Sequence, residues 1–255
     1  MTAVAFFNRA RELLDQVERT QLPAIRQAAE ACASSIGDGK LVHLFGTGHG
    51  AIPALEAFPR SGSLVGFHAI VELPITLLHH VWGDMGVAQY RFLHRQEGYG
   101  QAILEAHRLD PADTLILFSH SGINAVILDM AHTAKAQGLT VVGVTSRPHS
   151  SAVQPRHSSG RRLYEVADVV IDTGAPLGDA CVEVPGLDDP VAAVSTVLVT
   201  AIVDALIAET AAVMVERGQR PHVEVNLNLP REQSAREHNN AGYAELWRRV
   251  AERTG

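Results

Sequence analysis

Short apolar segments alternate along the chain with segments of helical periodicity, and this alternation constrains the fold more than any other feature. The apolar segments are continuous rather than interrupted by polar residues, which is typical of parallel strands covered by helices on both faces. Ligands bind beyond the carboxyl ends of such strands, so residues that directly follow a strand are the first candidates for a site. We expect strands at Leu41–Phe45, about Ser63–Ile70, Asp113–Phe118, Thr140–Val144 and Asp168–Asp172.

Helical segments are expected around these strands. A helical stretch runs from about Val4 to Ala33, and Pro23 should divide it into two helices, because proline cannot donate the interior hydrogen bond. A long helix is expected from Pro190 to Arg217, with Gly218 just after its end. Shorter helices are expected at Ala51–Phe58, Gln101–Arg108, Asn124–Gln137 and Tyr243–Arg253.

Composition and charge argue against several classes of protein. The 255 residues are 46% hydrophobic and 19% charged, which is too apolar for a disordered chain. A formal net charge of −7 leaves no basic excess to follow a nucleic-acid backbone. Two cysteines, Cys32 and Cys181, are too few for a disulfide framework or a cysteine-based metal site.

The most apolar stretch, Val191–Ala208, contains polar residues that include Asp204. It therefore suits a buried core helix better than a membrane span. The first residues lack the pattern of a signal peptide. We expect a cytoplasmic protein that binds neither nucleic acid nor membrane.

The loop Gly46-Thr47-Gly48-His49-Gly50 lies between an expected strand and an expected helix. Glycines let the backbone approach a ligand, and a helix N-terminus offers unpaired N–H groups to an anion. A purely structural turn is the alternative. The spacing Gly46-x-Gly48-x-x-Ala51 also fits a dinucleotide-binding fingerprint, for which Glu72 would be the acidic residue.

A second loop, Ser119-His120-Ser121-Gly122-Ile123-Asn124, also lies between a strand and a helix. A helix cap needs only one hydroxyl, so two hydroxyls and an amide around a glycine favour a ligand site. A dinucleotide-binding enzyme has no need of this loop. Two anion-type loops on one sheet indicate a single site shared between them.

Together the two loops resemble the SIS (sugar isomerase) family, in which a strand–GxGxS–helix unit is followed by a strand–SxSGxT/N–helix unit. The second loop matches this pattern well. The first departs from it, because Gly50 stands where the family has a serine. Within the family the chain resembles sugar-isomerase-domain and phosphoheptose-isomerase-like proteins. Further stretches that carry the resemblance are Glu56–Gly62, Arg156–Asp172, Gly174–Ala180, Val194–Val197 and Glu237–Asn239.

The resemblance implies a single SIS domain over residues 1–255, with an N-terminal helical arm (about 1–36) and a C-terminal tail (about 219–255). The implied fold is an α/β three-layer αβα sandwich with a five-stranded parallel sheet. It also implies a homodimer or homotetramer with a shared active site, and a small-molecule sugar substrate. The residues expected to bind this substrate are Thr47, Gly48, His49, Arg60, Ser119, His120, Ser121, Gly122, Asn124, Asp179 and Asn239.

Aldose–ketose isomerisation needs a base that moves a proton between C1 and C2. Glu72, His79 and His80 follow the second expected strand, where related isomerases carry that base, and the choice among them stays open. Glu56 is a further catalytic candidate, although it could simply pair with Arg60 four residues later. His238 is a candidate acid/base for ring opening. No strong metal motif is present, and we expect neither metal nor cofactor.

The sequence therefore predicts an aldose–ketose isomerase acting on an anionic sugar. Without a serine hydroxyl at Gly50, a 6-sulfonate such as sulfoquinovose is an alternative to a 6-phosphate, because a sulfonate carries one charge and a phosphate monoester nearly two. A non-catalytic sugar-phosphate sensor and an SIS-type lyase or deglycase are the competing hypotheses. A dehydrogenase is the weakest of them.

Overall fold

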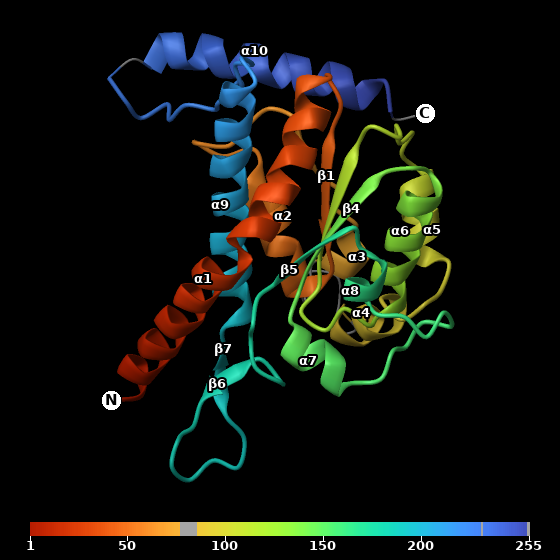
Figure 1. The fold of residues 1–255 in the computed structure, drawn as a ribbon, viewed down its shortest axis with the longest axis vertical. Helices are drawn as coiled ribbons and strands as arrows, with labels where there is room; N and C mark the ends of the chain where they lie inside the picture. Colours follow the sequence, from red (N-terminus) through yellow and green to blue (C-terminus); the bar gives the residue numbers. More distant parts are fainter. Residues whose placement is uncertain (77–85, 231, 254–255) are drawn as a thin grey trace.

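A computed structural model describes residues 1–76, 86–230 and 232–253. Its centre is a five-stranded parallel sheet with strand order β2-β1-β3-β4-β5. Helices cover both faces of the sheet (Figure 1), so the expected three-layer αβα architecture is confirmed. The strands of this sheet are β1 (Val42–Gly46), β2 (Phe67–Ala69), β3 (Thr114–Phe118), β4 (Thr140–Thr145) and β5 (Val169–Asp172).

The helices divide into two layers, one on each face. One apolar layer joins the sheet to α1 and α9, and the other joins it to α5 and α6. The described helices are α1 (Thr2–Gly37), α2 (Ile52–Ala57), α3 (Leu73–Thr76), α4 (Gly86–Leu93), α5 (Tyr99–Glu105), α6 (Ala125–Ala136), α7 (Arg147–Ala152), α8 (Leu163–Val166), α9 (Ser195–Glu216) and α10 (Glu232–Ala251), with a 3₁₀ helix η1 (Gly48–Ala51).

Successive residues of each strand point to opposite layers. Leu44 and Ile116 pack towards α1 and α9, whereas Phe45 and Leu117 pack towards α5 and α6. Because both faces of the strands are buried, the strands carry no polar alternation. This arrangement accounts for the continuous apolar segments in the sequence.

The strand order reverses between β1 and β3. These two strands are neighbours and pair in parallel from Val42 with Thr114 to Gly46 with Phe118, while β2 lies on the far side of β1 and β4 on the far side of β3. In open parallel sheets, ligands bind where the order reverses. The loops Gly46–Gly50 and Ser119–Asn124 follow these two strands.

Two helix boundaries predicted at prolines are wrong. Pro23 lies inside one continuous helix, α1, because residues after it, including Ile25 and Cys32, are buried in the core against α9. This packing outweighs the roughly 3 kcal/mol that an interior proline costs. The predicted helix from Pro190 begins only at Ser195, because Val191–Ala193 form strand β7, which pairs antiparallel with β6 (Ala180–Val182).

The predicted closing helix is longer than expected: α10 spans Glu232–Ala251 and crosses the edge of the sheet where the strands begin (Figure 1). There Arg253 hydrogen-bonds the fully buried carboxylate of Asp113. Arg249 donates to the Lys40 carbonyl at 3.2 Å. The C-terminal segment is thus tied to the starts of β1 and β3.

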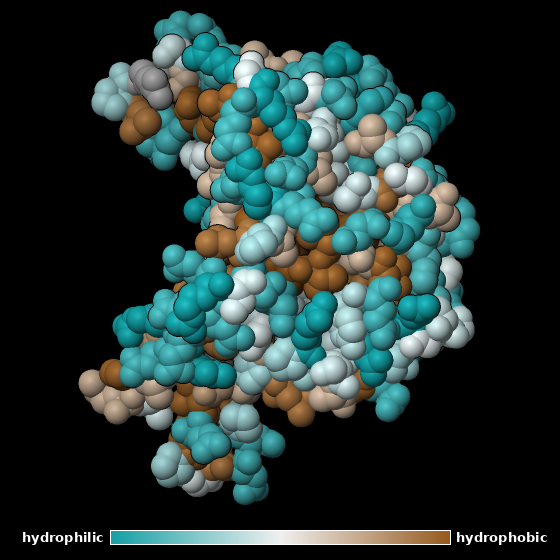
Figure 2. Space-filling view, in the orientation of Figure 1, coloured by the Kyte–Doolittle hydropathy of each residue, from teal (hydrophilic) through white to brown (hydrophobic). Residues whose placement is uncertain are grey.

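Helix α9 is long and apolar enough, by length and composition, to cross a membrane. One of its faces is buried against α1 and α2, as expected for a core helix. Its other face carries exposed small and apolar residues, among them Val197 and Val215. Figure 2 shows hydrophobic residues at the surface on the side of the molecule where α9 lies, where the surface is hollowed.

A buried histidine of β1, His43, lies between the Asp113 carboxylate and the half-buried His68 of β2. His43 Nε2 lies 3.4 Å from Asp113 Oδ2, and its Nδ1 lies 3.0 Å from Nδ1 of His68. Hydrogen bonds with His43 and Arg253 lower the pKa of the Asp113 carboxyl below its usual range, although burial alone would raise it. Burial, together with His43 and His107, lowers the pKa of His68 to about 3.

We expect the free energy of unfolding to decrease as the pH falls from about 7 towards 4. The pKa of His68 is depressed in the folded state, so between its unfolded value near 6.5 and its folded value of about 3 the unfolded chain binds the extra proton. One such group gives a slope of roughly 1 kcal/mol per pH unit. Urea unfolding at several pH values measures it. His68→Gln should be less steep than wild type, and an unchanged slope in this variant would contradict the assignment.

Candidate functional site

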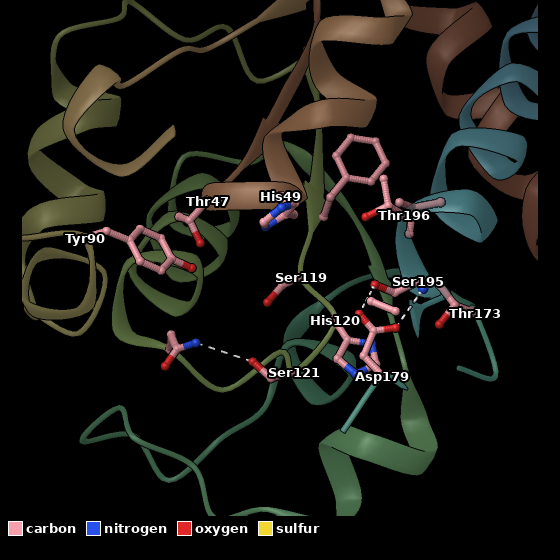
Figure 3. A pocket seen from close by; sticks show the side chains of 15 residues that line it. Thr47, His49, Tyr90, Ser119, His120, Ser121, Thr173, Asp179, Ser195 and Thr196 are labelled. Carbon is pink, nitrogen blue, oxygen red and sulfur yellow. Dashed lines mark hydrogen bonds between the residues drawn. The ribbon is translucent and has the colours of Figure 1, made fainter. Parts of the chain in front are cut away.

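A cavity of about 280 Å³ opens at the carboxyl ends of β1 and β3. The two loops form its floor, and α4, the segment before β6 and the start of α9 form its walls (Figure 3). It therefore lies where the strand order reverses. The residues that line it are Thr47, His49, Gly50, Tyr90, Phe118, Ser119, His120, Ser121, Asn124, Thr173, Asp179, Ala193, Ser195, Thr196 and Val199.

The first loop is wound tightly at the end of β1. A Cβ added at Gly46 would lie 1.9 Å from the Gly50 carbonyl oxygen, and Gly48 has φ +56° with the Tyr90 ring beside it. A Cβ at Gly50 would lie 2.9 Å from the carbonyl oxygen of Phe118. Since real Cβ atoms do not come this close to backbone, a serine at position 50 would require the loop or β3 to shift. The departure of Gly50 from the family pattern thus follows from packing in this chain.

The second loop is closed by its own hydrogen bonds. Ser119 Oγ accepts from the Gly122 amide at 3.1 Å, and Asn124 Nδ2 donates to Ser121 Oγ at 3.4 Å. Gly122 has φ +61°, and a Cβ there would lie 2.9 Å from Thr145 Oγ1. Arg156 donates to Asn124 Oδ1 at 3.3 Å, which orients the amide group towards Ser121. The hydroxyls of this loop are thus fixed at the N-terminus of α6.

These features form a hydroxyl cradle, by which we mean Thr47, Ser119, Ser121 and Asn124. Hydroxyl and amide donors beside a helix N-terminus suit an anionic group. No lysine or arginine is found among the described residues that line the cavity, so the positive side of the α6 dipole and neutral donors supply the attraction. The structure thus brings these four predicted residues to one cavity, and their binding of substrate stays a prediction.

Asp179 forms part of the opposite wall and caps α9. Its Oδ1 accepts from the amides of Val194 at 3.0 Å and Ser195 at 2.7 Å, and its Oδ2 accepts from Ser195 Oγ at 2.6 Å. Its backbone lies in the left-handed region, with φ 73°, which is uncommon outside glycine. The carboxylate satisfies the first amides of α9, and it places a negative charge beside the cavity.

Two imidazoles reach the cavity from the two loops. His49 lies in η1 and is exposed. His120 lies between the two serines of the second loop, and both of its ring nitrogens are buried without a hydrogen-bond partner. Burial lowers the pKa of His120 to about 4, in spite of the nearby Asp179 carboxylate. At neutral pH this ring is uncharged and can both donate and accept a hydrogen bond.

Several lining residues were missed by the sequence analysis. Thr173 and Thr196 contribute hydroxyls from the end of β5 and the start of α9, beside Ser195, and Tyr90 contributes a phenol from α4. Ser195 and Thr196 lie in the Val194–Val197 segment that resembles the family, and this segment could have identified them. The region around Tyr90 shows no periodicity, so nothing in the sequence pointed to it.

Glu56, Arg60 and Glu72 do not line the cavity. Arg60 Nη1 lies 2.8 Å from Glu56 Oε1, as the alternative of a simple i,i+4 pair predicted, and Arg60 is exposed. The Glu72 carboxylate accepts a hydrogen bond from Tyr99 Oη at 2.8 Å. Burial, together with Glu72, raises the pKa of Tyr99 to about 12. These side chains are therefore satisfied by partners outside the cavity.

His238 and Asn239 are also placed elsewhere, because they fix α10 to the segment before it. His238 Nε2 donates to the Val223 carbonyl at 2.8 Å. Asn239 accepts from the Val225 amide and donates to its carbonyl, both at 2.9 Å. In the described chain, these two side chains join α10 to the segment that contains Val223 and Val225. The other two candidate bases, His79 and His80, lie outside the described residues.

No three His, Cys, Asp or Glu side chains converge to hold a metal ion anywhere in residues 1–76, 86–230 and 232–253.

Comparison with known proteins agrees with this geometry. Residues 5–146 match the model of the SIS domain. A UPF0309 protein of Geobacillus thermodenitrificans is 34% identical over 92% of this chain and 90% of its own length. A UPF0309 protein of Halalkalibacterium halodurans is 35% identical over 88% of this chain and 89% of its own length. The chain therefore belongs to the SIS-domain family and, within it, to the UPF0309 proteins.

Two solved structures show the same fold. Phosphoheptose isomerase GmhA from Neisseria gonorrhoeae has a TM-score of 0.53 at 16% identity, covering 82% of this chain and 97% of that chain. The sugar isomerase domain of an RpiR transcription factor from Sphaerobacter thermophilus has a TM-score of 0.52 at 17% identity, covering 94% of this chain and 98% of that chain. An isomerase and a transcription factor thus share the fold, and the fold alone does not separate catalysis from sensing.

Replacing Asp179 by alanine should lower the free energy of unfolding by about 1–2 kcal/mol, because the first amides of α9 lose their acceptor. The left-handed backbone also disfavours alanine at this position. Urea unfolding monitored by circular dichroism measures the change. Asp188→Ala, on the exposed loop between β6 and β7, is the matched control and should stay within about 0.5 kcal/mol of wild type. Equal stability of the two variants would show that Asp179 does not hold α9.

Proposed function

We propose that the protein is an aldose–ketose isomerase whose substrate is a sugar with a terminal anionic group. The observation that carries this proposal is the convergence of the two loops on one cavity. The hydroxyl cradle offers neutral donors to the anion, while His49 and His120 offer imidazoles to the rest of the sugar. Isomerisation needs little more than a base and polar groups around two vicinal oxygens. Of the two solved structures named above, one is a phosphoheptose isomerase.

Among the described residues that line the cavity, His49 is the best candidate for the base that moves the proton between C1 and C2. It is exposed, it lies on the short 3₁₀ helix after β1, and its ring faces the cavity beside Ser119 (Figure 3). Asp179 is less suited to remove a proton, because its carboxylate oxygens already accept three hydrogen bonds. The hypotheses that Glu72, His79 or His80 carries the proton stay open as alternatives.

Among anions, the site favours a monoanion such as a sugar 6-sulfonate. The cradle lacks the serine hydroxyl that the family pattern places at position 50, and the packing of Gly50 against Phe118 keeps it out. Asp179 adds a negative charge to the opposite wall, and no described lysine or arginine lines the cavity to offset it. A phosphate monoester, with nearly two charges, would be repelled more strongly than a sulfonate. A 6-phosphate is the alternative.

We also propose that the protein forms a homodimer or homotetramer. The exposed face of α9 carries Val197, Ala201, Ala205 and Ala208 in one stripe along the helix, with the exposed Asp204 beside them. Small residues in such a stripe let two helices approach closely, and burying them against a second copy would remove apolar surface from water.

Light scattering coupled to gel filtration should give at least twice the 27.4 kDa of one chain, and Ala205→Glu should shift the protein towards the monomer. A monomeric wild type would contradict this proposal.

Proton NMR in D2O tests the activity. The panel contains glucose 6-phosphate, fructose 6-phosphate, sedoheptulose 7-phosphate and sulfoquinovose. We expect deuterium to enter at C2 of one sugar while its partner ketose or aldose appears, with sulfoquinovose turned over at least as efficiently as glucose 6-phosphate. Much faster conversion of a phosphate would overturn the preference for sulfonate. Binding without exchange would favour a sensor, and cleavage products would favour a lyase.

Ser121→Ala tests the cradle. Loss of a hydroxyl that donates to a charged group should raise KM about tenfold or more, with a smaller effect on kcat because the anion is remote from the reacting carbons. Ser151→Ala removes an exposed hydroxyl of α7 that bonds the Arg147 carbonyl, so it is the matched control and should leave KM unchanged. If Ser121→Ala has a wild-type KM, the anion binds elsewhere.

A further inference from the structure

The imidazole of His120 lacks hydrogen-bond partners in a place where it should have two. Both of its ring nitrogens are buried, and neither has a partner within the described chain. Buried polar atoms are nearly always paired, and each exception calls for a specific explanation. Here the ring borders the cavity, so an occupant of the cavity can supply the missing partner.

The backbone of His120 is held by two hydrogen bonds, so a loosely placed loop does not explain why the ring nitrogens are unpaired. Its carbonyl oxygen accepts from the Ser146 amide at 3.1 Å and from Thr145 Oγ1 at 3.2 Å. These two donors come from the end of β4, the strand next to β3. The residue is thus pinned between the ends of two strands. A backbone fixed in this way places the side chain at the edge of the cavity.

Two groups near the ring have hydrogen bonds to other partners. The His149 ring lies against it, with 4.4 Å between ring centroids, but Nδ1 of His149 accepts from the Gly178 amide at 3.0 Å. The Asp179 carboxylate accepts from Val194 and Ser195. Neither group makes a hydrogen bond to His120, whose ring borders the cavity.

Thr47 and His120 lie on different sides of the cavity. Figure 3 shows Thr47 and Tyr90 on one side, and His120 beside Asp179 and Ser195 on the other, with Ser119 and Ser121 between them. A sugar whose anion is held at the Thr47 side of the hydroxyl cradle therefore extends its remaining carbons towards His120. Those carbons include the carbonyl carbon and its neighbour, where isomerisation takes place.

We propose that His120 is a catalytic residue whose ring N–H donates a hydrogen bond to the carbonyl oxygen at the reacting end of the sugar. This role rests on the proposed isomerase function and adds to it. A separate base takes the proton from C2, the electron pair forms the C1=C2 bond, and O1 takes the negative charge that the His120 N–H stabilises. The proton then returns to C1, while the hydroxyl proton of O2 passes to O1, so the ketose has the composition of the aldose.

The protonation state of His120 suits this role. Burial lowers its pKa to about 4, which outweighs the nearby Asp179 carboxylate, and His149 acts in the same direction as burial. The ring is therefore neutral at working pH. A neutral imidazole places a hydrogen-bond donor at the carbonyl oxygen without placing a second charge beside Asp179.

Two variants of His120 with opposite expectations test the proposal. His120→Leu removes the donor and should lower kcat at least 100-fold, the effect of losing one donor to a developing oxyanion, while KM changes less than threefold. His120→Gln retains an N–H and should keep kcat within about tenfold of wild type. His132→Gln, an imidazole on α6 that does not line the cavity and whose Nε2 lies 3.4 Å from Ser159 Oγ, should behave as wild type. Circular dichroism checks that each variant is folded.

The same rates separate this role from the proposed function. If the wild type converts no sugar in the panel, the isomerase proposal fails and the catalytic role of His120 fails with it. If the wild type converts a sugar but His120→Leu keeps its kcat within threefold, only the role of His120 is overturned. A rise in KM with unchanged kcat also overturns it, because it would make His120 a binding residue only. Equal losses in the Leu and Gln variants would contradict a hydrogen-bond donor.

Discussion

The parallel pairing of β1 with β3 is the constraint on which the rest of the structure depends. It places Gly46 opposite Phe118 and brings the two following loops to one edge of the sheet. The first loop is then so close to β3 that a side chain at position 50 would collide with the carbonyl oxygen of Phe118. The floor of the cavity, with the hydroxyls and the imidazoles of the two loops, follows from that register.

The lining of the cavity has one carboxylate, Asp179, and no described lysine or arginine. Its other polar groups are a helix terminus and neutral donors, whose interactions are directional and act over short distances. Asp179 stands on the opposite wall because α9 needs an acceptor at its first turn. The proposed anion would therefore be selected by geometry and by its charge rather than by strong ion pairing.

The sequence was sufficient to predict the five strands, the three layers and the two loops, because continuous apolar strands and glycine-rich strand ends have direct physical causes. It failed at Pro23 and Pro190, where packing against α9 and pairing of β7 with β6 override local preference. It also assigned Glu56, Arg60, His238 and Asn239 to the site, although each has a partner elsewhere. Such partners depend on tertiary contacts, which no local pattern reports. The unpaired nitrogens of His120 could not be predicted for the same reason.

The contact between Arg253 and Asp113 joins the C-terminal helix to the sheet. Asp113 is fully buried and accepts from the amides of Leu41 and Asp110, and His43 lies beside it, while Arg253 lies just beyond α10. Without the Arg253 guanidinium the buried carboxylate would lack its cation, at a cost of about 3–5 kcal/mol. One side chain more than a hundred residues away along the chain therefore stabilises the starts of the two central strands.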